Sequence, residues 1–188
     1  MSATGNVLGD LPAPVRRTGL VVSVPEAEQL VASFRRRFHA GAVARSIPPH
    51  VTILFPFVPA TAFDTRARLS VASHFREQRA FDASLAGTGH FPAHVWLAPA
   101  PRDRFVDLIT ATCDRSPDTP PYNGAFDAPE PHLAIGEASD ETSVEAVAEA
   151  ADREIAPFLP LLFRVDAATL FEEQADGTWV AAATFPFG

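Results

Sequence analysis

The chain has 188 residues, enough for one substantial hydrophobic core with two small lobes but short for two independent domains. No apolar run approaches the roughly 20 residues that a membrane span requires, and the single cysteine, Cys113, excludes an intramolecular disulfide. The net charge of -8 argues against a long nucleic-acid duplex as a partner, because duplexes are bound through many cationic contacts to phosphates. We therefore expect a cytoplasmic monomer that binds small or terminal ligands and no membrane.

The N-terminal segment lacks the pattern of a signal peptide. It contains no apolar stretch behind a basic flank, and it includes Leu11-Pro12-Ala13-Pro14. We expect residues 1–15 to form a flexible arm and residues 16–188 to form a single domain.

The first half of the chain alternates strand and helix patterns. An apolar run over 18–24 predicts a strand, and apolar residues at helical spacing over 27–38 predict a helix. The Pro-His-Val-Thr motif at 49–52 opens a short strand that Pro56 ends. A capping box at 61–64 then precedes a second predicted helix, and a further strand is predicted around 81–87.

The second half repeats this order. A strand is predicted over 94–98, a helix through Phe105, Leu108, Ile109 and Thr112, and a Pro-His strand over 131–135 that Gly136 ends. A capping box at 142–145 opens another helix. Two alternating runs, 162–171 and 178–185, follow, and Asp176-Gly177 predicts a hairpin between strands.

The repeated order indicates an internal duplication. It predicts an α+β fold with two lobes, approximately 16–89 and 90–188, between which the terminal elements can cross. Each lobe would be a small antiparallel-rich sheet covered by helices on its outer face. The uncovered faces would then form a central cleft.

The two Pro-His strands point to chemistry. Because side chains alternate along a strand, His50 shares its face with Thr52, and His132 shares its face with Ala134. Two imidazoles can supply the base and the acid that cleavage of a phosphodiester needs, since histidine changes protonation near neutral pH. The Thr52 hydroxyl can donate to a phosphoryl oxygen. This chemistry requires no metal or other cofactor.

Pro49-His50-Val51-Thr52 and Pro131-His132-Leu133-Ala134 resemble the paired motifs of the two-histidine phosphoesterase superfamily. Phe91-Pro92, Trp96-Leu97-Ala98-Pro99, the segment 120–126, Asp176-Gly177-Thr178-Trp179 and the final Phe-Pro-Phe-Gly are similar to its bacterial 2'-5' RNA ligase-like branch. The resemblance covers about Arg17 to Gly188. It implies a bilobal fold and metal-free action on nucleoside 2',3'-cyclic phosphates or 2'-5' linkages, with His50 and His132 in proton transfer and Thr52 on the phosphate. Ala134 departs from the pattern.

Three further residues are candidates for substrate binding. Tyr122 and Phe126, in the loop before the second motif, could stack on a base or serve as packing anchors. Arg45, just before the first motif, could meet phosphate or remain solvated. His90 and His94 do not form a metal site, because Phe91-Pro92 breaks their geometry. His39 and His74 lie near predicted helix C-termini, where a structural role is expected.

Ala134 leaves a second interpretation open. The chain could be a weakly active or non-catalytic module that binds nucleotides or phosphate through a degenerate second motif. Fold alone never fixes substrate, so a different ester is a third possibility.

Overall fold

The computed structural model describes residues 15–125 and 130–188. Its strands are β1 (Thr18–Ser23), β2 (His50–Leu54), β3 (Phe81–His90), β4 (His94–Ala100), β5 (Leu133–Glu137), β6 (Leu161–Val165), β7 (Ala167–Glu173) and β8 (Trp179–Pro186). Its α-helices are α1 (Glu28–Phe38), α2 (Ala40–Ala44), α3 (Thr65–Arg76), α4 (Arg102–Asp114) and α5 (Val144–Glu154). Short 3-10 turns lie at Pro25–Ala27, Ala60–Ala62, Pro121–Gly124 and Ala156–Phe158.

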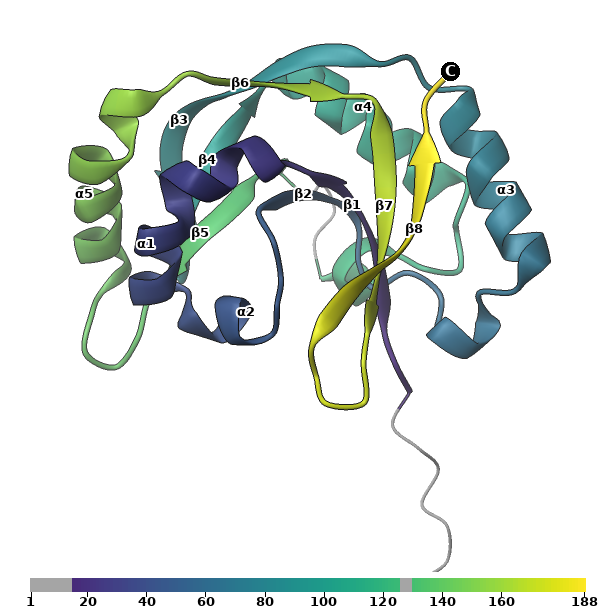
Figure 1. Cartoon of the computed structure of the whole chain (residues 1–188), viewed down its shortest axis with the longest axis horizontal. Coiled ribbons are helices and arrows are strands. Elements are labelled where there is room, and N and C mark those ends of the chain that lie inside the picture. Colours follow the sequence, from purple (N-terminus) through teal and green to yellow (C-terminus); the bar gives the residue numbers. More distant parts are fainter. Residues whose placement is uncertain (1–14, 126–129) are drawn as a thin grey trace, which may run out of the picture.

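Within the described residues the strands form two four-stranded antiparallel sheets (Figure 1). The first sheet has the order β2-β1-β7-β8 and the second the order β5-β4-β3-β6. The expected α+β class with two antiparallel sheets is confirmed. The strands that begin at the two histidine motifs, β2 and β5, are edge strands at corresponding positions of their sheets.

The sheets do not follow the two halves of the chain. Strand β3, from the first half, pairs with β4 and β6, whereas β7 and β8 return from the C-terminal end to pair beside β1. The run predicted as one strand over 162–171 is divided at Asp166, since β6 belongs to one sheet and β7 to the other. Strand alternation continues through this crossover, so the sequence pattern contained no sign of it.

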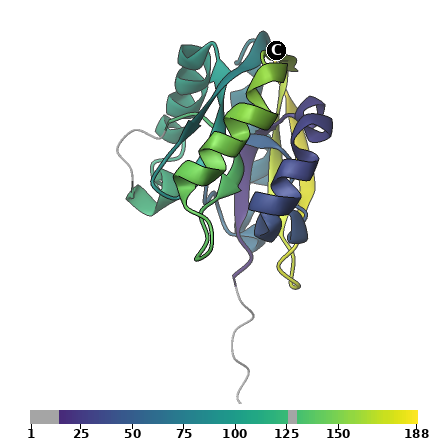
Figure 2. The same ribbon diagram turned by 90° about the vertical axis from the view of Figure 1, so that its left-hand side faces the viewer.

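Helices cover the outer faces of the sheets (Figures 1 and 2). Helices α1 and α5 lie side by side against the second sheet, and Arg37 of α1 binds Glu154 of α5 with 2.7 Å between Nη2 and Oε1. Helix α3 packs against β8, and α4 contacts both β2 and β4. Helix α1, from the first half of the chain, therefore supports the sheet that contains β5.

One hydrophobic core joins the two lobes. It includes Val22 of β1, Ile53 of β2, Leu97 of β4 and Ile135 of β5, each at most 3% exposed. The predicted face of α4 is confirmed: Phe105, Leu108, Ile109 and Thr112 are all buried. A continuous core of this kind fixes the two sheets relative to each other.

Three local boundaries differ from those predicted. The N-cap of α3 is Asp64, whose carboxylate accepts from the Ala67 amide, and the N-cap of α5 is Ser143, so neither Thr61 nor Thr142 opens its helix. Both capping boxes were predicted to start too early in the chain. In each case the side-chain oxygen of a later residue, Asp64 or Ser143, caps the helix. Strand β5 also continues through Gly136, where a Cβ would lie 2.8 Å from Val147 Cγ1. Gly136 therefore allows α5 to pack closely against β5, and it does not end the strand.

Candidate functional site

The two histidine strands meet where the sheets adjoin. Strands β2 and β5 contact each other, with His50 as the first residue of β2 and His132 directly before β5. Val51, Ile53, Leu133 and Ile135 are buried in the core. His50 and Thr52 consequently lie on the opposite face of β2, as the alternation predicted.

Both imidazoles are held in the same way. The Nδ1 atom of His50 lies 2.8 Å from the carbonyl oxygen of Pro48, and the Nδ1 atom of His132 lies 2.7 Å from that of Glu130. Because a carbonyl oxygen can only accept, each Nδ1 carries a proton. This leaves Nε2 of each ring as the nitrogen that can accept or donate a proton at a ligand.

The surroundings favour neutral imidazoles. Burial lowers the pKa of His50 to about 4; the bond to Pro48 opposes this effect, while Arg35 and His132 add to it. Burial also lowers the pKa of His132, and the Glu130 carbonyl opposes that shift. His132 acts electrostatically on His50, and the strands that carry the two motifs are in contact.

Thr52 has a partner that comes from the opposite motif's loop. The side chain of Tyr122 is hydrogen-bonded to Thr52, and the Tyr122 amide donates to the Phe55 carbonyl at 2.6 Å. Tyr122 has a φ of 50°, a left-handed conformation that a bulky residue rarely adopts. The loop before the second motif therefore docks on the first motif. Phe126, the other aromatic residue considered for stacking, lies outside the described residues.

The second motif is built differently. Ala134 supplies no hydroxyl, and its cross-strand neighbour is Trp96 of β4. The rings of Phe91 and Trp96 lie 5.0 Å and 6.4 Å from the His132 ring, between centroids. The second motif thus has two aromatic rings beside its histidine and no hydroxyl on its strand, whereas the first motif has the hydroxyl of Thr52.

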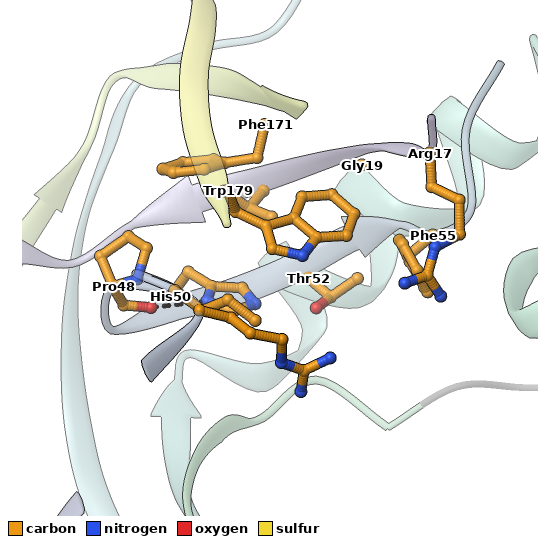
Figure 3. A pocket seen from close by; sticks show the side chains of 11 residues that line it. Arg17, Gly19, Pro48, His50, Thr52, Phe55, Phe171 and Trp179 are labelled. Carbon is orange, nitrogen blue, oxygen red and sulfur yellow. Dashed lines mark hydrogen bonds between the residues drawn. The ribbon is translucent and has the colours of Figure 1, made fainter. Parts of the chain in front are cut away.

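A cavity of about 240 Å³ opens beside His50 and Thr52 (Figure 3). Phe55, Phe171 and Trp179 supply aromatic walls, and the nitrogen edge of the Trp179 indole faces the Thr52 side of the cavity. Trp179 Nε1 is buried and has no hydrogen-bond partner within residues 15–125 and 130–188. Burial of a donor without a partner costs free energy, so a ligand acceptor that bound this N–H would remove the cost.

Two arginines line the same cavity. Arg17 is paired with Glu173 through Nε and Nη2, at 2.8 Å and 2.6 Å, and its guanidinium lies 5.7 Å from the ring centroids of both Phe55 and Trp179. Arg45 donates from Nε to the Gly41 carbonyl. Arg45 therefore lies at the cavity that His50 also lines.

Comparison with known families agrees with this geometry. The family model described as the 2'-5' RNA ligase superfamily matches residues 23–177, which include both histidine motifs. The chain belongs to the 2'-5' RNA ligase superfamily. This superfamily is a branch of the two-histidine phosphoesterases, so the resemblance carried by the motifs is confirmed. No curated protein matched the chain.

Several solved structures share the fold of this chain. Escherichia coli LigT complexed with 3'-AMP has a TM-score of 0.59 and 16% identity, covering 92% of this chain and 98% of LigT. TT0787 of Thermus thermophilus has a TM-score of 0.55 and 18% identity, covering 90% of this chain and 97% of its own. Kluyveromyces marxianus Usb1 has a TM-score of 0.50 and 13% identity, covering 91% of this chain and 97% of Usb1. At these identities the likeness establishes the fold of the superfamily and nothing finer.

Several residues around this superfamily site escaped the sequence analysis. His39, at the C-cap of α1 as its position suggested, has a pKa that burial lowers to about 4, and Arg35, His94, His50 and Arg45 add to this shift. Arg35 lies 3% exposed next to the His50 ring. It was detectable, because it interrupts the apolar face of α1 four residues after Val31. Arg17, Phe55, Phe171 and Trp179 come together only through strand pairing.

Other residues lie away from the site or form no further one. His74 is buried between α3 and α4, with Nε2 3.0 Å from the Thr112 hydroxyl, and has the structural role expected of it. Among the described residues no three His, Cys, Asp or Glu side chains gather as a metal site would require. No helix in the described ranges is long and apolar enough to cross a bilayer.

Proposed function

We propose that this protein is a metal-independent phosphodiesterase or RNA-end-processing enzyme that acts on nucleoside 2',3'-cyclic phosphates or 2'-5' linkages. The observation that carries the proposal is the matched pair of imidazoles, each fixed by an Nδ1 bond to the carbonyl two residues upstream. Two such rings supply a base on one side of phosphorus and an acid on the other. Superfamily membership supports phosphoester chemistry in general.

The remaining groups fit a nucleotide. Thr52, oriented by Tyr122, would donate to a non-bridging phosphoryl oxygen, where charge grows in the transition state. Arg45 would meet the phosphate from the His50 side. The Phe55, Phe171 and Trp179 walls would take a base, since aromatic faces stack on any base. LigT has been solved with 3'-AMP, a ligand of this chemical class.

The proposal is tested with the purified full chain and a chelator. A panel of the four nucleoside 2',3'-cyclic phosphates and 2'-5' linked dinucleotides is incubated, and products are separated by chromatography. We expect turnover of at least one substrate, and a loss of about a hundredfold or more in His50→Ala and His132→Ala. Arg164→Gln, an exposed substitution on β6, is the control. Turnover of no substrate, or full activity in His50→Ala, contradicts the proposal.

Ala134 favours a second candidate, a nucleotide-binding module without catalysis. Loss of one preorganised donor costs on the order of a hundredfold or more in rate in other enzymes. Calorimetry with nucleoside 2'- and 3'-monophosphates separates the two functions. Binding of a monophosphate without turnover of any panel member supports the module, whereas turnover excludes it.

A further inference from the structure

Each histidine motif is tied to a helix by an arginine. Arg35 of α1 donates from Nη2 to the carbonyl of Ile47 at 2.5 Å. Ile47 directly precedes Pro48, whose own carbonyl holds His50 Nδ1. Arg35 therefore fixes the segment that sets the orientation of the His50 ring.

The second motif has an equivalent tie. Arg102, the first residue of α4, donates from Nε and Nη2 to the two carboxylate oxygens of Glu130, at 2.7 Å and 2.6 Å. The backbone carbonyl of the same Glu130 holds His132 Nδ1. A paired, bidentate contact of this kind restrains both position and direction.

We propose that Arg35 and Arg102 are positioning residues for the two imidazoles, and that their unequal neutralisation makes His50 the base and His132 the acid. The assignment of base to His50 and acid to His132 rests on the proposed phosphodiesterase function. The positioning itself rests only on the contacts above.

The charge of Arg35 is poorly compensated. Arg35 is 3% exposed, its nearest carboxylate is Glu28 at 3.9 Å, and its Nε has no partner in the described part of the chain. The two charged or titratable groups that act on His50 are both basic: Arg35 of α1 and His132 before β5. The adjoining cavity is lined by Arg45 and by Arg17, whose charge is met by Glu173 at 2.6 Å. Burial, Arg35 and His132 disfavour protonated His50, and the Nδ1 bond to the Pro48 carbonyl opposes them.

His132 has a different neighbourhood. The charge of Arg102 is met by Glu130, and the Glu130 carboxylate favours the protonated form of His132, against burial and His94 of β4. His132 is therefore the better proton holder of the pair. Burial, the largest influence, still lowers the pKa of both rings.

This inequality gives the reaction a direction. The Nε2 atom of His50 accepts the proton of the attacking water or ribose hydroxyl as its oxygen bonds to phosphorus. The bond from phosphorus to the leaving oxygen breaks, and that oxygen takes the proton from Nε2 of His132. With water and a cyclic phosphate, the product is a nucleoside monophosphate, and the next proton exchange with solvent restores both rings.

The order of protonation is measured by NMR titration of the histidine ring protons in the full chain, with His50→Gln and His132→Gln used for assignment. We expect His50 to titrate at lower pH than His132. In Arg35→Met, His50 should titrate at higher pH, because the buried charge is gone. In Arg35→Lys, the charge remains but the reach to Ile47 is lost, so the titration of His50 should stay low.

Kinetics on a cyclic phosphate separate positioning from charge. Arg35→Lys and Arg35→Met should each lose about a hundredfold in kcat, as a misplaced reacting group does, whereas Arg102→Gln should lose about tenfold with little change in KM. Arg164→Gln is the matched control for Arg102→Gln. Like Arg102, Arg164 is exposed and is paired with a carboxylate, that of Asp82, at 2.6 Å.

Two results overturn the inference. One is a wild-type titration in which His50 takes up its proton at higher pH than His132. The other is kinetics of Arg35→Lys and Arg102→Gln equal to those of Arg164→Gln. If the wild type turns over nothing, the proposed function fails, yet the titrations still decide the inference. If Arg35→Met does not fold, Arg35→Lys and Arg102→Gln carry the test.

Discussion

The side chain of Tyr122, in the loop before the second histidine motif, is hydrogen-bonded to Thr52 of the first. This contact lets the loop of one motif orient Thr52, the proposed phosphate donor of the other. The two halves of the site are thus linked by a side-chain bond as well as by the shared core.

Removing this bond should lower activity through Thr52. We expect Thr52→Val to reduce kcat about a hundredfold, because a preorganised donor is lost, and Tyr122→Phe to reduce it by less, about tenfold. Both act on one donor, so the double variant should lose no more than Thr52→Val alone. Steady-state kinetics of the three variants test this. Strict additivity would show that Tyr122 acts by another route.

Restoring a hydroxyl at the second motif should raise activity. Ala134 faces the site from β5, and Ala134→Thr would supply the donor that the motif lacks. We expect kcat to increase about tenfold or more. Ala134→Val has the same shape without the hydroxyl and is the control. An equal gain in both variants, or none in Ala134→Thr, would mean that the hydroxyl is not what limits the rate.

Two histidines should make folding stability depend on pH. Burial lowers the pKa of His39 and of His50 to about 4, below the ordinary 6.5. Between these values the unfolded chain binds more protons, so stability is fully present above pH 6.5 and is lost as pH falls toward 4. We expect the free energy of unfolding to fall by about 2–4 kcal/mol over this window.

Urea titrations at a series of pH values measure this dependence. His39→Asn should reduce the slope between pH 6.5 and 4, because it removes one of the two histidines whose pKa is lowered to about 4. His90→Asn, at an exposed histidine at the end of β3, should leave the slope unchanged. Equal slopes in the wild type and in His39→Asn would refute the account.

Gly89 should be intolerant of any side chain. A Cβ there would collide with Trp96 Cη2, and the Trp96 ring stands beside His132. We expect Gly89→Ala to cost about 1–3 kcal/mol in unfolding free energy by overpacking and to lower activity by moving Trp96. Gly87→Ala, two residues earlier, has nothing within 4 Å of the added Cβ and is the control. Thermal unfolding and kinetics of both variants check this.

The sequence by itself determined most of the elements and the pair of motifs. Alternation in β2 placed Val51 and Ile53 in the core and left His50 and Thr52 on the other face, and helical spacing located the buried face of α4. These features depend on neighbours within one strand or one helix, so local periodicity is sufficient to predict them. The two Pro-His motifs are also short segments of consecutive residues, so their resemblance to the superfamily could be read from the sequence.

Only the tertiary structure decided which elements share a sheet and which side chains surround the imidazoles. The crossover at Asp166 sends β6 and β7 to different sheets, and α1 packs on the sheet of β5 although it precedes β2. Long-range pairings of this kind bring Tyr122 to Thr52 and Trp179 to the His50 cavity. No local pattern encodes them, because each arises from burial of surfaces that lie far apart in the chain.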